Sequence, residues 1–171
     1  MDGDEKAIFA EINSHGRSTE QKQISVAFAY VALVGVAAGA IPDFVVGGTW
    51  SAGAAAVVLF VLGLVVFRLT LIYRSWKVHY MKRTRVLAGD DWINGGSLPM
   101  PAWPSADFTI AATVGLVVIA VGTLAGSNVA AASSEAVFSQ WTGAVLGLIA
   151  SVGIVVTEHK HFTRWTRWRD L

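Results

Sequence analysis

The sequence predicts an all-α integral membrane protein whose four transmembrane helices form two hairpins. Apolar residues make up 54% of its 171 residues, charged residues only 15%, and the mean hydropathy is +0.54. A soluble domain carries about 25% charged residues. The apolar residues fall into four blocks of about 20 residues, which is the length that a helix needs to cross the hydrocarbon core of a bilayer. All basic residues except Arg68 lie in the leader, in the link between the second and third blocks, or in the tail.

The limits of the four blocks divide the chain into five segments. These are a polar leader (1–23), a first hairpin (24–73) with blocks at 24–41 and 52–73, a basic helix followed by a Pro/Gly loop (74–105), a second hairpin (106–157) with blocks at 108–126 and 138–156, and a basic-aromatic tail (158–171). Within the leader, the spacing of Ile8 and Ile12 favours a short amphipathic helix over residues 4–13, either on the membrane surface or against the ends of the spans.

The distribution of basic residues predicts the orientation. Of the 13 lysines and arginines, three lie in the leader, six lie between Arg68 and Arg85, and four lie in the tail, while the links 42–51 and 127–138 contain none. By the positive-inside rule, both termini are expected in the cytoplasm of a multi-pass plasma (inner) membrane protein. Ala38-Gly39-Ala40 resembles a signal-peptide cleavage site, but the leader is long and acidic, so the first block is interpreted as a retained span.

The second span is expected to continue as a cytoplasmic helix to about Leu87. Tyr73, Trp76 and Tyr80 share one face of this extension, and basic residues occupy the adjoining face. The candidates for contacts with lipid headgroups or with a cytoplasmic partner are Arg74, Lys77, Lys82, Arg83 and Arg85. The alternative is an ordinary solvated helix next to the membrane.

Small residues recur at helix-packing spacing on three of the four spans. They are Gly35 and Gly39 in the first span, Gly115, Gly122 and Gly126 in the third, and Gly143, Gly147 and Ser151 in the fourth. Such spacing lets helix backbones approach closely, which drives association inside a bilayer. It serves either packing within one four-helix bundle or association with other subunits, and an outward-facing stripe would favour the second.

The spans contain few side chains that could act in catalysis, metal binding or coupled transport. The chain has no cysteine, and Arg68 is the only ionisable residue within a block; it either snorkels to the interface or lies at a pore mouth. Coupled transporters need a titratable group near the midplane, and no span carries an Asp, Glu or Lys there. His159 and His161 are poorly spaced for a metal on one helix face. We therefore expect no catalytic residues, no metal, no cofactor and no nucleic-acid binding.

These observations favour a non-enzymatic membrane protein that acts as a structural or accessory subunit. Its partners would be the lipid bilayer and, through the Gly/Ala faces, further copies of itself or other membrane subunits. The alternative is a homo-oligomeric channel or pore-forming effector. The polar side chains available to line its lumen are Thr109, Thr113, Thr123, Thr142 and Ser151, with Arg68 at the mouth. No motif in the sequence is typical of one particular family.

Overall fold

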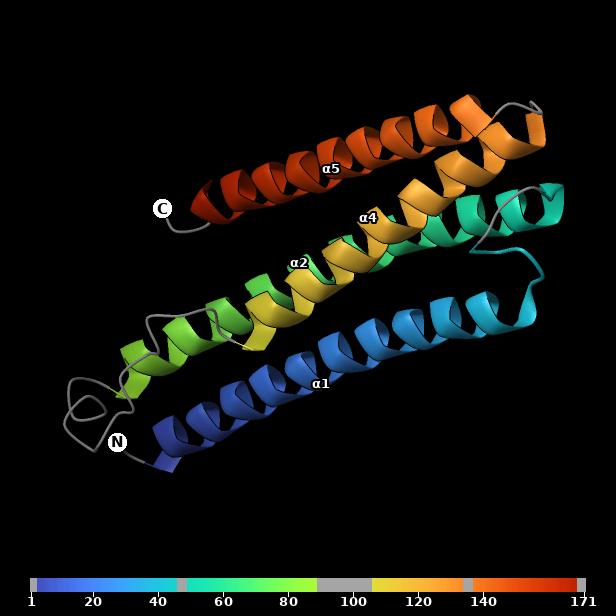
Figure 1. Ribbon diagram of the computed structural model, residues 1–171. Helices are drawn as coiled ribbons and strands as arrows, with labels where there is room; N and C mark the ends of the chain where they lie inside the picture. Colours follow the sequence, from blue (N-terminus) through green and yellow to red (C-terminus); the bar gives the residue numbers. More distant parts are fainter. Residues whose placement is uncertain (1–2, 46–48, 89–105, 134–136, 169–171) are drawn as a thin grey trace.

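The computed structural model describes residues 3–45, 49–88, 106–133 and 137–168. The described chain is all-helical: α1 (Gly3–Ala40), α2 (Trp50–Ala88), α4 (Ala106–Ser133) and α5 (Val137–Trp168). Each helix contains an apolar stretch that is long enough to cross a membrane. The prediction of four helices of this kind is therefore confirmed. The beginning of α1 and the end of α5 lie at the same end of the molecule (Figure 1).

The four helices form an open row rather than a closed bundle. Helix α1 packs on α2, α2 on α4 and α4 on α5, with few contacts between α1 and α4 or between α2 and α5. Within the described residues α1 and α5 do not touch, and they form the two outer edges of the row (Figure 1). Each edge helix consequently leaves a long apolar face uncovered by the rest of the chain, with Phe28 and Val36 on α1 and Leu146 and Ile149 on α5 exposed.

The turn from α1 to α2 is defined by local sequence. Pro42 cannot donate a backbone hydrogen bond and restricts the residue before it, which ends α1 at Ala40. Asp43 then adopts a positive φ of 57°, a conformation that aspartate tolerates better than most residues. Thr49 begins α2 as an N-cap, because its Oγ1 accepts a hydrogen bond of 3.3 Å from the amide of Ala52.

Asn128 ties this turn to α4. Its side-chain amide donates to the carbonyl of Phe44 at 3.1 Å and to that of Leu124 at 2.9 Å, and both Asn128 and Phe44 are buried. Sequence reasoning placed Asn128 in the link 127–138, but α4 continues to Ser133. A buried amide at this position joins the two hairpins near the end of the molecule remote from the termini.

Helix α1 is a single helix of 38 residues, about 57 Å long. The leader and the first span are thus continuous, whereas the sequence favoured a separate short helix over residues 4–13. Helix α2 is of similar length and ends at Ala88, next to the predicted end at Leu87. The polar half of α1 runs beside the extension of α2, where the rings of His15 and Tyr80 stack with centroids 5.9 Å apart. The two helices therefore support each other beyond the apolar region.

Several expectations fall outside the described residues. They concern the Pro/Gly loop over 89–105 and the last residues of the tail, 169–171. The side chains of Lys82, Arg83 and Arg85 are likewise not described, although α2 includes these positions. Helix α5 continues to Trp168, so most of the basic-aromatic tail belongs to this helix.

Candidate functional site

Most of the small residues predicted from spacing meet in the seam between α4 and α5. A Cβ atom built on Gly126 would overlap the carbonyl oxygen of Gly143, and one built on Gly143 would overlap the carbonyl oxygen of Gly126. Gly147 lies against Gly122 in the same way. Only glycine permits this separation of the two backbones, so these four residues pack the second hairpin internally.

Ser151 completes the α4–α5 seam. Its side chain is fully buried, occupies the space where a Cβ of Gly122 would lie, and donates a hydrogen bond of 2.6 Å to the carbonyl of Gly147. Gly115 lies further along α4, where an added Cβ would come within 3.2 Å of the ring of Phe67 on α2. Both positions therefore serve packing inside the chain.

Gly35 and Gly39 are placed differently from the other predicted glycines. A Cβ on either residue would meet no atom of the described chain within 4 Å. Both residues are exposed on α1, at one edge of the helical row. A glycine inside a helix costs about 1 kcal/mol relative to alanine, and at these positions no close packing within the chain offsets that cost. The pair Gly35 and Gly39 therefore faces outwards, unlike the glycines of the α4–α5 seam.

A close contact that the sequence analysis did not identify lies between α1 and α2. The hydroxyl of Tyr30 donates to the carbonyl of Leu59 at 3.2 Å, and its ring fills the space that a side chain at Gly63 would need. Tyr30 is 2% exposed. The signal was present in the sequence, because Ala52, Ala56 and Gly63 recur at helical spacing on the second span.

Lys77 and Arg74, two of the basic residues predicted to lie next to the membrane, have partners within the chain. The Nζ atom of Lys77 lies 3.0 Å from Oε1 of Glu20 on α1, and the two side chains are only 18% and 35% exposed. The guanidinium of Arg74 lies 5.5 Å from the centre of the Phe108 ring on α4. Two of the five cations predicted to contact headgroups thus connect helices of the same chain.

Arg68 also has a partner. Its Nε atom lies 3.8 Å from Oε2 of Glu158 on α5, and the two side chains are 65% and 36% exposed. Exposed ion pairs at such a distance contribute little to stability, about 0–1 kcal/mol. The pair nevertheless places Arg68 beside α5 at the end of the molecule that carries the termini.

The polar side chains suggested for a lumen do not gather on one face of the chain. Ser151 is sealed between α4 and α5, Thr113 is exposed and donates to the carbonyl of Thr109, and Thr123 donates to the carbonyl of Ile119. Within the described residues, no three histidine, aspartate or glutamate side chains are grouped so as to hold a metal ion.

The fold and these faces define the class of the protein: a multi-pass, all-helical membrane protein with an open row of four spans. Beyond this class the comparisons provide no relative. No protein-family model, curated protein or solved structure matches the chain significantly. The surfaces of its own helices are therefore the basis for a functional proposal.

Proposed function

We propose that this chain is a non-enzymatic membrane subunit that associates with further copies of itself. The contact would lie on the half of α1 remote from the termini, which contains Gly35 and Gly39. The observation that supports this proposal is the position of Gly35 and Gly39. They form a small-xxx-small pair on an edge helix, and a Cβ atom built on either residue would meet no described atom within 4 Å. In a bilayer, apolar side chains gain little from contact with each other rather than with lipid, so helices associate where backbones can approach closely.

The open row of helices adds a second argument. In a single chain the apolar stretches of α1 and α5 are less buried than those of α2 and α4, because each edge helix packs mainly on one neighbour, although α2 also has exposed apolar residues such as Val58 and Val61. On α5, Gly143 and Gly147 lie in the seam with α4 and the single Gly153 is open, whereas on α1 the pair Gly35 and Gly39 is open at a spacing of four residues. This contrast favours α1 as the edge that receives a partner helix.

Cysteine cross-linking tests the proposal directly, because the chain has no cysteine of its own. We expect the Gly39→Cys variant to form disulfide-linked dimers in native membranes under mild oxidation. The matched control is Ile149→Cys, an exposed apolar position on α5. Cross-linking at residue 149 but not at residue 39 would contradict the assignment to α1.

The alternative function, a homo-oligomeric channel, stays a prediction and requires a different arrangement of side chains. Its polar side chains would have to meet around an axis between copies, and the hydroxyls of Thr113 and Thr123 on α4 already donate to the backbone of their own helix. Dye or ion release from proteoliposomes tests it. A non-conducting subunit gives no release above that of empty vesicles, whereas release that depends on the protein would favour the channel.

A further inference from the structure

We infer that α1 and α4 hold an anionic glycerophospholipid, with its acyl chain in an apolar groove between the two helices and its phosphate at Arg17. The inference rests on two hollows that lie along one face of α1 and on the positive charge of Arg17. It concerns the half of α1 nearer the termini and does not depend on the proposed self-association of the other half.

The first hollow is an apolar groove of about 370 Å³ between α1 and α4. Its α1 wall includes Ala27, Phe28 and Val31, and its α4 wall includes Thr109, Ile110 and Thr113. The Thr113 hydroxyl bonds to the carbonyl of Thr109, so its donor is used within its own helix. A groove of this kind inside a bilayer suits a hydrocarbon chain.

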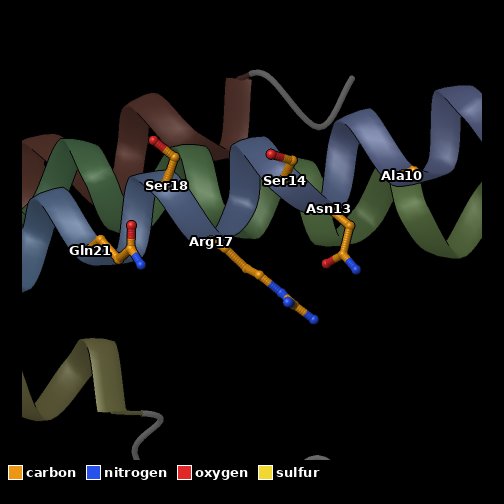
Figure 2. Close-up of a pocket in the computed structure, with 6 residues that line it drawn as sticks. All are labelled: Ala10, Asn13, Ser14, Arg17, Ser18 and Gln21. Atoms are coloured by element: carbon orange, nitrogen blue, oxygen red, sulfur yellow. The ribbon is translucent and has the colours of Figure 1, made fainter.

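The second hollow lies on the polar half of α1 and has a volume of about 440 Å³. Asn13, Arg17 and Gln21 line it, together with serines (Figure 2). Figure 2 shows Arg17 and Asn13 projecting from α1 to the same side. Ser14 and Ser18 project to the other side of α1 in the same view. The donors beside Arg17 are therefore its own guanidinium and the side-chain amide of Asn13, and both groups bind phosphate oxygens.

The two hollows are in register along one helix face. Residues 13, 17, 21, 24, 28 and 31 recur at intervals of three and four, which places them on one side of α1. Arg17 precedes Ile24, at the near end of the groove, by seven residues or about 10 Å. The polar headgroup layer is about 5–8 Å thick on each side of a bilayer, so an arginine at this distance reaches the phosphate level.

Charge complementarity identifies the occupant as an anionic lipid. Lys77 and Arg68 are paired with carboxylates, and Arg74 lies over a ring. Arg17 has no carboxylate within ion-pair distance among the described residues, and it is exposed. An unneutralised guanidinium directly in line with a hydrocarbon groove matches the two ends of a phospholipid that carries net negative charge.

The test uses purified full-length protein in nanodiscs, followed by native mass spectrometry to count retained lipids. Equimolar phosphatidylglycerol and phosphatidylcholine serve as the probes. We expect one phosphatidylglycerol to be retained about fivefold over phosphatidylcholine, since one basic side chain near the headgroups contributes about that factor. Arg17→Gln should abolish the preference and Arg17→Lys should keep it.

Two further variants separate the groove from the charge. Lys22→Gln is the matched control, because Lys22 is exposed and lies about 140° around α1 from Arg17; it should retain the preference. Thr113→Phe fills the groove from an exposed position and should reduce the retention of both lipids. Helical content by circular dichroism verifies that each variant is folded.

Four results would overturn the inference. The first is equal retention of the two lipids by the unmodified protein, and the second is the same loss in Lys22→Gln as in Arg17→Gln. The third is full competition by glycerol phosphate, which has no acyl chain and would show that the groove is not used. A fall in oligomer mass with Thr113→Phe, without any change in lipid retention, would assign the groove to a second copy of the chain instead.

Discussion

Gly126 and Gly143 face each other across the α4–α5 seam so closely that a methyl group on either would overlap the carbonyl oxygen of the other. The seam continues through Gly122, Gly147 and Ser151, and its geometry depends on the absence of side chains. The contact between α4 and α5 is the most extensive of any described helix pair, and it explains why α5 stays in the row although most of its apolar residues are exposed.

The first prediction concerns this seam. Gly126→Ala should lower the free energy of unfolding in mild detergent by about 1–3 kcal/mol, because the two backbones must move apart. Gly153→Ala is the matched control, since a Cβ at that position meets no described atom within 4 Å. It should be neutral or stabilising by up to about 1 kcal/mol through helix propensity. Equal effects at the two positions would contradict the close packing.

The second prediction concerns Tyr30 and Gly63. Gly63→Ala should destabilise the protein, because the added methyl overlaps the Tyr30 hydroxyl and approaches the ring and Val118. Tyr30→Phe alone should cost about 0.6–1.7 kcal/mol through the lost hydrogen bond to Leu59. Since Tyr30→Phe also removes the nearest clashing atom, the double variant should lose less than the sum. Strict additivity in thermal unfolding would contradict the contact.

The third prediction concerns the ion pair between Lys77 and Glu20. Glu20→Lys should destabilise the paired polar halves of α1 and α2, and the exchanged pair Glu20→Lys with Lys77→Glu should recover most of the loss. The effect should be small, about 0.2–1 kcal/mol, and weaker at high salt, because Glu20 is partly exposed. Hydrogen exchange of the amides around residues 15–22 measures it locally. Exchange rates unaffected by either change would contradict the pairing.

The fourth prediction concerns Asn128. Asn128→Leu should destabilise the chain by about 1–2 kcal/mol, since it leaves the buried carbonyl of Phe44 without its side-chain donor. Ser133→Ala is the control, because the Ser133 hydroxyl is exposed and bonds only within its own helix. Unfolding in detergent compares the two. An Asn128→Leu variant as stable as Ser133→Ala would show that the amide does not hold the turn.

The helical spans were predictable because their signal is local. Four blocks of about 20 apolar residues and the sorting of basic residues require no knowledge of partners, and α2 ends next to the predicted position. Glycine spacing likewise identified Gly126, Gly143 and Gly147. The spacing of the glycines indicates that one face of a helix consists of small residues. It does not indicate which other helix packs against that face.

The features that sequence reasoning missed depend on contacts between distant segments. The polar half of α1 packs on α2 through His15 and Glu20, which meet Tyr80 and Lys77 more than 50 residues further along the chain. The predicted headgroup role of Lys77 ignored this partner. Asn128 could not be recognised as a link to Phe44, since the distance of 84 residues between them in sequence hides the hydrogen bond.

The native mass of the protein in mild detergent tests the proposed self-association most directly. The mass of one chain is 18.2 kDa. We expect the unmodified protein to have a multiple of this mass, the Gly35→Leu/Gly39→Leu variant to have the mass of one chain, and Gly153→Leu to match the unmodified protein. All three exchanged positions are open in the single chain, so the fold itself should tolerate each change. An unmodified protein that has the mass of one chain, or a Gly35→Leu/Gly39→Leu variant that keeps the larger mass, would contradict association through α1.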